Sequence, residues 1–186
     1  MKEYIRKYPL FSLCGLNCGL CPCYHTEGSS KCPGCGGFDF HLKHPTCPVI
    51  TCNKKHDHVE YCFQCSSYPC QRYSEPSKRD SFITYKNVIS DFGKASELGI
   101  KTYQGELNKK IKMLELLIKN YNDGRRKSFY CIAVNLIELK ELEQLMKKMD
   151  QEIERRDLDL KGKINLIVQL IESIARKGKI ELKLRK

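Results

Sequence analysis

Apolar residues recur at steps of three and four positions through the second half of the chain, a spacing that places them on one face of a helix. The pattern predicts about four helices. The first begins near Asp80 and ends before Gly99, a residue suited to a helix C-terminus. The other three span about 103–121, 128–153 and 159–176. Their short connections favour antiparallel neighbours.

The first half of the chain lacks this periodicity. Between Cys14 and Cys70, nine of 57 residues are Leu, Ile, Val, Phe or Met, which is below the roughly 20% at which a chain struggles to build a core. This segment needs cross-links of another kind, and it contains eleven of the twelve cysteines. The sequence therefore predicts a mainly α protein, in which an irregular cysteine-knuckle zinc module (residues 1–80) packs on a helical bundle (residues 81–186). The tail from 179 to 184 alternates like a short strand, although a lone strand needs a partner.

The cysteines form pairs and triplets whose spacings suit a tetrahedral metal ion. They are C-x3-C-x2-C at Cys14, Cys18 and Cys21, C-P-G-C at Cys32 and Cys35, C-x4-C at Cys47 and Cys52, and C-x2-C-x4-C at Cys62, Cys65 and Cys70. A two-residue gap lets two sulfurs face one ion, and a structural zinc site joins two such pairs from separate segments. These cysteines supply enough thiolates for two zinc ions, but their spacing does not reveal which of them share an ion.

Two other chemistries compete with zinc. Cys14, Cys18 and Cys21 have the spacing of the radical-SAM cluster motif, so an iron–sulfur cluster is the alternative cofactor. The chain lacks the repeated strand–helix pattern of the barrel that such radical enzymes need. Disulfides are disfavoured because the N-terminus lacks the apolar core of a signal peptide, and no apolar run is long enough to span a membrane. We expect a cytoplasmic protein with reduced thiols.

The ordered motifs resemble those of a known family. They are Cys14-Gly15-Leu16-Asn17-Cys18-Gly19-Leu20-Cys21-Pro22, Cys32-Pro33-Gly34-Cys35, Cys47-Pro48-Val49-Ile50-Thr51-Cys52 and Tyr61-Cys62-Phe63-Gln64-Cys65-Ser66-Ser67-Tyr68-Pro69-Cys70. Over roughly residues 8–100, the chain resembles domain-of-unknown-function family 3795, a bacterial and archaeal group described as zinc-binding. The resemblance implies ten metal ligands: Cys14, Cys18, Cys21, Cys32, Cys35, Cys47, Cys52, Cys62, Cys65 and Cys70. It implies no reaction or substrate.

The remaining cysteines and the histidines have no assigned role. Cys23 departs from the family pattern, in which a small apolar residue commonly follows that Cys-Pro, and it is either a spare or a redox-sensitive thiol. Cys131 stands on an apolar helix, where a buried small hydrophobe is expected. The histidines are His25, His41, His44, His56 and His58. None has the paired spacing of a zinc-finger helix, so we interpret them as loop residues.

The function predicted from these residues is zinc binding, in which the metal is structural and supports a protein or nucleic-acid interaction surface. The formal net charge is +11, but acidic residues interleave with the basic ones along the helices, so nucleic acid is only weakly indicated and a protein partner stays open. No membrane partner is predicted. No zinc-protease motif, nucleophile elbow or phosphate loop occurs, so we predict no enzyme. The alternative function is that of an iron–sulfur or redox-active protein or an unassigned metalloenzyme.

Overall fold

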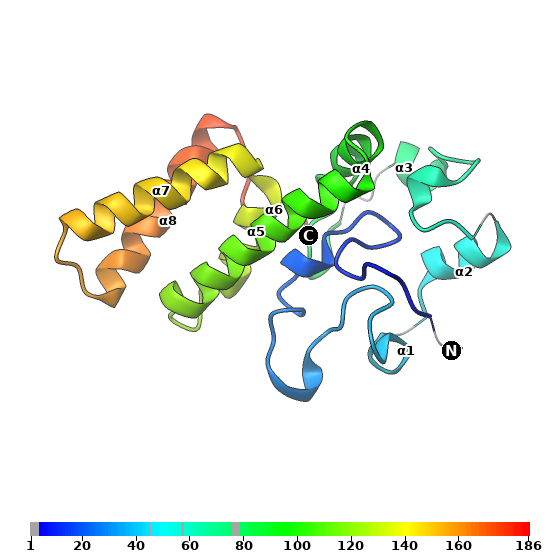
Figure 1. The fold of residues 1–186 in the computed structure, drawn as a ribbon, viewed down its shortest axis with the longest axis horizontal. Coiled ribbons are helices and arrows are strands. Elements are labelled where there is room, and N and C mark those ends of the chain that lie inside the picture. Colours follow the sequence, from blue (N-terminus) through cyan, green and yellow to red (C-terminus); the bar gives the residue numbers. More distant parts are fainter. Residues whose placement is uncertain (1–3, 45, 57, 76–78) are drawn as a thin grey trace. The chain divides into compact units, whose positions relative to one another are not determined.

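The computed structural model describes residues 4–44, 46–56, 58–75 and 79–186, and it is mainly helical (Figure 1). These residues form eight α-helices, three short 3-10 helices and no strand. The predicted mainly α class is confirmed. The chain divides into two compact units, unit 1 with Met1–Leu107 and Leu184–Lys186, and unit 2 with Asn108–Lys183. The domain boundary predicted after residue 80 from composition stays a prediction.

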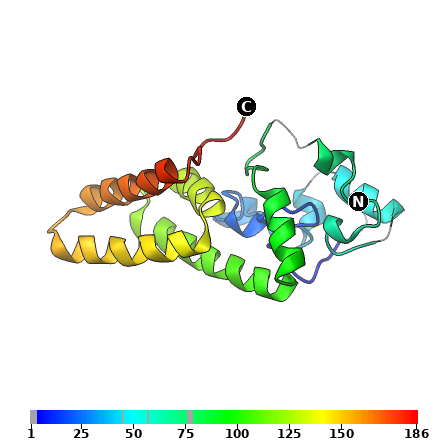
Figure 2. The ribbon, with the colours of Figure 1, turned by 90° about the horizontal axis from the view of Figure 1, so that it is seen from above.

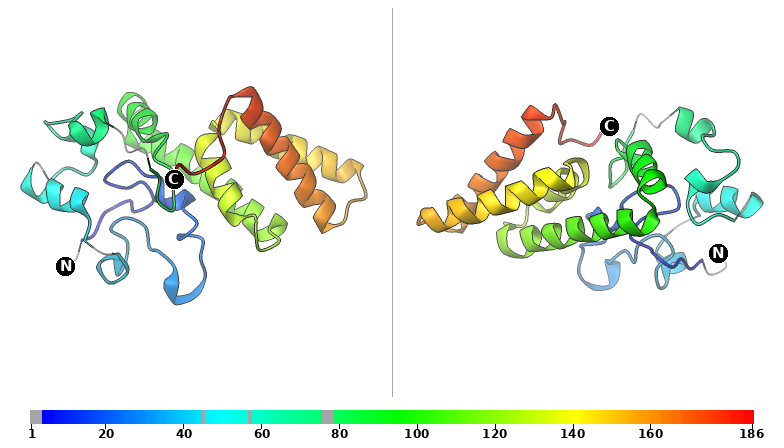
Figure 3. Two further views of the ribbon diagram at one scale, coloured as in Figure 1. Left: turned by 180° about the vertical axis from the view of Figure 1, so that it is seen from behind. Right: turned by 45° about the horizontal axis from the view of Figure 1, so that its top comes forward.

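The cysteine-rich part of unit 1 is irregular, as the sequence predicts. Its α-helices are short, with α1 at Phe40–Lys43, α2 at Pro48–Lys55 and α3 at Gln71–Ser74. The 3-10 helices are η1 at Cys18–Leu20, η2 at Gly28–Ser30 and η3 at Cys62–Gln64. Coil segments join these pieces (Figure 3). Pro48 begins α2 because a helix needs no N–H donor at its first position.

Aromatic rings form the centre of unit 1. The ring centroid of Phe11 lies 5.0 Å from that of Tyr61 and 4.6 Å from that of Tyr103, which is on α5 (Ile100–Tyr121). Phe92, on α4 (Val88–Glu97), lies 5.8 Å from Phe11 and 5.1 Å from Phe63. Edge and tilted ring pairs of this kind stabilise beyond the area they bury. The cysteine-rich segment therefore obtains much of its core from residues on both sides of it.

A buried polar network holds the first cysteine knuckle against α4 and α5. The side-chain amide of Asn17 donates to Asp91 Oδ2 at 2.9 Å, and Tyr103 OH donates to Asn17 Oδ1 at 2.9 Å. Asn87 also donates to the Asp91 carboxylate. Asn17 and Asp91 are both buried. Because a buried carboxylate is costly without donors, these contacts fix the loop between Cys14 and Cys18 relative to the helices.

Unit 2 contains the second part of α5 and three further helices. They are α6 at Lys127–Leu136, α7 at Leu139–Arg155 and α8 at Leu160–Lys177. Helices α7 and α8 lie side by side (Figure 2). Asp159 caps α8 by accepting a hydrogen bond from Gly162 N at 2.7 Å. No helix in the described part of the chain has an apolar stretch of the length needed to cross a bilayer.

The predicted single helix over 128–153 is wrong, because the structure breaks it between α6 and α7. Ile137 and Glu138 have extended backbones, with ψ of 139° and 148°. The break buries Ile137 completely. Residues 130 to 135 are all buried, so this part of α6 is buried on every side, whereas α7 has one buried face. No Gly or Pro marks the break, and periodicity alone does not locate it.

The C-terminal tail is a coil rather than the short strand considered from its alternation. Within this tail, Arg185 contacts Asp80, and both residues belong to unit 1. The Asp80 carboxylate accepts hydrogen bonds from Arg185 N at 2.8 Å, Arg185 Nη2 at 2.8 Å and Tyr85 N at 2.9 Å. Thr84 Oγ1 donates to it at 3.2 Å. Burial opposes ionisation of this carboxyl, but the hydrogen bonds from Arg185 and Tyr85 outweigh it and lower the pKa of Asp80 to about 2.

Candidate metal centre

All twelve cysteines are free thiols in the structure, and eleven of them lie in unit 1. Cys131 is the exception. It is buried on α6 with 2% of its surface exposed, as expected for a small core residue. The cysteines of unit 1 fall into three neighbourhoods, which we call the inner, outer and side groups.

The inner group consists of Cys14, Cys18, Cys35 and Cys47. Three of its members, Cys14, Cys35 and Cys47, pack against a small apolar cluster that includes Leu13. Burial raises the pKa of the Cys18 thiol well above its ordinary value, and negative charge on Cys35 and Cys14 would raise it further. Burial likewise raises the pKa of Cys14, with a further contribution from Cys47. A bound cation would favour the joint ionisation of thiols that oppose one another's ionisation in this way.

A buried arginine lies beside the inner group. The Arg6 side chain is 1% exposed, and its Nη2 lies 3.0 Å from Glu60 Oε1. Its Nη1 donates to Phe11 O at 2.7 Å, whereas its Nε is buried and has no hydrogen-bond partner among the described residues. Burial raises the pKa of Cys35 to about 11, and the Arg6 charge opposes that rise. Arg6 therefore favours a thiolate at Cys35.

The outer group consists of Cys52, Cys62, Cys65 and Cys70. All four line one cavity of about 40 Å³, together with His56 and the rings of Tyr68 and Tyr73. They come from α2, the two ends of η3 and the residue before α3. Within the knuckle, Cys65 N donates to Cys62 O at 3.1 Å. Burial raises the pKa of Cys62 to about 11, and neighbouring thiolates at Cys14, Cys52 and Cys70 would raise it further.

Residues 10–75, which include every member of these groups, match the model of a family described as a protein of unknown function (DUF3795). This segment belongs to that family. The match confirms the family predicted from the motifs. No curated protein and no solved structure matches the chain significantly.

The side group of the DUF3795 segment consists of Cys21, Cys23 and Cys32, of which Cys23 departs from the family pattern. Cys32 N donates to Cys23 O at 3.0 Å, so Cys23 lies next to Cys32 as well as near Cys21 in the sequence. Burial raises the pKa of Cys21 to about 12, and negative charge on Cys23 would add to the rise. Sequence reasoning left Cys23 without a neighbour, although its position one residue beyond Cys21-Pro22 is the signal that it stays close. A ring nitrogen of His25 lies 2.8 Å from Gly19 O.

The structure groups the thiols of the DUF3795 segment by neighbourhood rather than by coordination geometry. Among the described residues, no three Cys, His, Asp or Glu side chains are arranged as a metal site. The donor chemistry nevertheless fits a thiophilic ion, because each group offers several thiols and the inner group has the positive charge of Arg6 beside it. The ten predicted ligands are thus distributed as four inner, four outer and two side cysteines.

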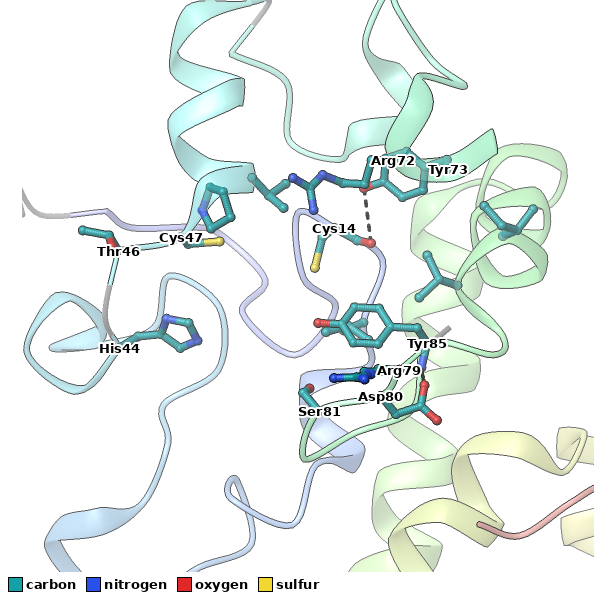
Figure 4. A pocket seen from close by; sticks show the side chains of 15 residues that line it. Cys14, His44, Thr46, Cys47, Arg72, Tyr73, Arg79, Asp80, Ser81 and Tyr85 are labelled. Carbon is teal, nitrogen blue, oxygen red and sulfur yellow. Dashed lines mark hydrogen bonds between the residues drawn. The ribbon is translucent and has the colours of Figure 1, made fainter. Parts of the chain in front are cut away.

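A second, larger cavity of about 440 Å³ opens beside the inner group (Figure 4). The thiols of Cys14 and Cys47 point into it. Arg72 and Arg79 enter from two sides, and His44 lies at the edge. The fifteen lining residues all belong to unit 1. Sequence reasoning missed this cavity because residues far apart in the chain form it.

Proposed function

We propose that the DUF3795 segment binds two zinc ions through cysteine thiolates and that these ions are structural. The observation that carries the proposal is the collection of the four outer cysteines around one small cavity. Four thiolates are a common ligand set for structural zinc, whereas a catalytic zinc keeps a position open for water. Bound zinc contributes directly to folding, which suits a segment with few aliphatic residues.

The neighbourhoods suggest how the ligands are shared. We assign Cys52, Cys62, Cys65 and Cys70 to one ion, and Cys14, Cys18, Cys35 and Cys47 to the other. Each set joins residues from separate chain segments, as structural zinc sites do. Four thiolates on Zn²⁺ leave a net charge of −2, and Arg6, which also pairs with Glu60, lies beside the inner set at Cys35. Cys21 and Cys32 stay outside both sets, beside Cys23.

The role of the metal is to hold the DUF3795 segment in one shape for an interaction with a partner. A cytoplasmic location suits this role, because reduced thiols are available there to bind metal. The principal rival is an iron–sulfur cluster, for which the Cys14, Cys18 and Cys21 spacing is suitable. The two cofactors differ in colour and composition, so one measurement separates them.

The test is metal analysis of protein purified without oxygen, together with its visible spectrum. We expect two zinc ions per chain and a colourless protein. Iron with labile sulfide and a visible absorption band would overturn the zinc proposal in favour of a cluster.

Serine variants test the assignment of ligands to each ion. Cys65→Ser with Cys70→Ser should lose one zinc and keep the other, and Cys18→Ser with Cys35→Ser should lose the second ion instead. Cys131→Ser is the matched control, because Cys131 is buried on α6 in unit 2, and it should keep both ions. Retention of two zinc ions by either double variant contradicts the assignment.

A further inference from the structure

We propose that Cys23 and Cys32 form a disulfide with each other by exchange with a small-molecule disulfide, so that the side group is a site of reversible thiol modification. The inference rests on the proposed function, because the two proposed ligand sets leave Cys21 and Cys32 beside Cys23 and outside both zinc ions. A thiolate that binds zinc is occupied by the ion, whereas a thiol without metal stays available as a nucleophile. The side group is then the reactive part of a segment whose other cysteines are structural.

The backbones of Cys23 and Cys32 are in direct contact. Cys32 N donates a hydrogen bond to Cys23 O at 3.0 Å. When the distances from these two atoms to their own Cα atoms are added, the two Cα atoms lie at most about 6.9 Å apart, and any bend at either atom shortens the separation. Disulfides usually join residues whose Cα atoms are about 4.4 to 6.8 Å apart. The backbone therefore needs little movement to accept this bond.

The chain between the two cysteines is able to adjust to a new bond. It contains η2, which has no buried residue, and residues 27–31 are all exposed. A Cβ built on Gly28 would meet nothing within 4 Å, so this part of the loop has open space around it. Because the fold already holds the two ends of the loop together, the bond between the cysteines closes without a further search by the chain.

The three cysteines of the side group are accessible to a small reagent. Cys21, Cys23 and Cys32 are each partly exposed, whereas Cys131 is 2% exposed. A cysteine that reacts must be reached by its partner as well as ionised, and a buried structural cysteine is inert. Cys131 should therefore stay unmodified under conditions that oxidise the side group.

Cys21 is the rival partner for Cys23, because its thiol is in hydrogen-bond contact with that of Cys23. A bond between them would close a small ring that contains Pro22, whose φ is fixed by its own ring. Tyr24 N also donates to Cys21 O at 3.0 Å, which holds this turn in place. A disulfide that forces such a turn out of shape is strained and easily reduced. The link between Cys23 and Cys32 is therefore the stable product.

The reaction is a pair of thiol–disulfide exchanges. The thiolate of Cys23 attacks one sulfur of the small disulfide, whose S–S bond breaks and releases one small thiolate. The thiolate of Cys32 then attacks the Cys23 sulfur of the mixed disulfide and releases the second small thiolate. The two cysteines together lose two electrons and two protons, which convert one small disulfide into two small thiols. An excess of reducing thiol reverses both steps.

The experiment treats the full chain, as purified with its metal, with oxidised glutathione and maps the products by non-reducing tryptic mass spectrometry. Cleavage after Lys31 separates Cys23 from Cys32, so their disulfide joins two peptides, whereas a link between Cys21 and Cys23 stays within one peptide. We expect the joined peptides as the first product, with the zinc content unchanged and both thiols restored by excess reduced glutathione. A first product at the inner or outer cysteines, or a link between Cys21 and Cys23 in its place, would overturn the proposal.

Single variants identify the two partners. Cys23→Ala should fold, because Cys23 is partly exposed and alanine is smaller, and it should form the joined peptides at least tenfold more slowly than the native chain. Cys21→Ser should still form them, and Cys131→Ser is the matched control, which should react at the native rate. If Cys23→Ala forms the link at the native rate, or if Cys21→Ser abolishes it, the assigned pair is wrong. Zinc content before oxidation reports on the metal proposal separately.

Discussion

The contact between Asp80 and Arg185 should stabilise unit 1 in a pH-dependent way. Replacing Asp80 with Asn removes the charge that holds the C-terminal tail. The pKa of this carboxyl is about 2, against an ordinary value of 3.8. At about 1.4 kcal/mol per pKa unit, the change from 3.8 to about 2 corresponds to ~2.5 kcal/mol. Arg185 is 29% exposed, so water screens part of the interaction, and we expect a loss of about 1 to 2 kcal/mol at pH 7.

The sign of the pH dependence follows from the lowered pKa. A carboxyl that ionises more easily in the folded state contributes stability above its unfolded pKa of about 3.9, and that contribution disappears as the pH falls toward 2. The difference in the free energy of unfolding between the native chain and Asp80→Asn should therefore be constant from pH 7 to about pH 5 and shrink below that. Using the difference cancels the effects of acid on the cysteines.

The assay is urea unfolding followed by far-ultraviolet circular dichroism at each pH. Arg185→Ala should lose about 1 kcal/mol, because Asp80 keeps its hydrogen bonds from Tyr85 and Thr84. Lys186→Ala removes the neighbouring exposed cation and should cost nothing measurable. If Asp80→Asn and Arg185→Ala are as stable as the native chain at pH 7, the tail is not held by this contact.

Two further perturbations test the packing and the metal. Gly15 has φ of +88°, and a Cβ there would lie 2.8 Å from Phe92 and Val88 atoms. Gly15→Ala should therefore lower the free energy of unfolding by about 2 kcal/mol or more. Gly105→Ala is the control, because Gly105 lies in open space on α5, and it should leave the free energy of unfolding unchanged or slightly raised. A chelator under reducing conditions should remove the amide-exchange protection of residues 10–75 and leave that of α7 and α8 intact; retained protection in residues 10–75 would contradict a structural metal.

The helical half of the fold could be predicted from sequence because its apolar residues follow the helical period closely. The pattern located α5 and α8 to within a few residues. It failed at Ile137, where the helix ends at a buried residue with an extended backbone and no Gly or Pro marks the end. The periodicity of apolar residues reports which face of a helix is buried. The end of α6 depends instead on the residues that pack around it, which are distant in sequence, so no local pattern marks it.

The cysteines of the candidate site could be predicted from the sequence, but which of them lie together could not. Spacing identified the cysteines, because knuckle spacing is local. The proposed division into inner and outer groups depends on long-range placement, as when Cys52 on α2 lines the same cavity as Cys70. Arg6, which faces Cys35 from outside every motif, gave no signal in the sequence. The same holds for Arg72 and Arg79, whose common cavity exists only in the folded chain.

The packing of unit 1 changes what loss of metal should do. If the boundary predicted after residue 80 alone governed unfolding, loss of metal would disorder residues 1–80 and leave every helix after Asp80 folded. However, Phe92 on α4 packs on Phe11. Asn17, which lies between the predicted ligands Cys14 and Cys18, donates a hydrogen bond to Asp91, also on α4. A knuckle that opens therefore exposes one face of α4 and leaves a buried carboxylate short of a donor. Disorder from metal loss should reach α4 and stop before α7 and α8, which lie in unit 2 and pack on each other.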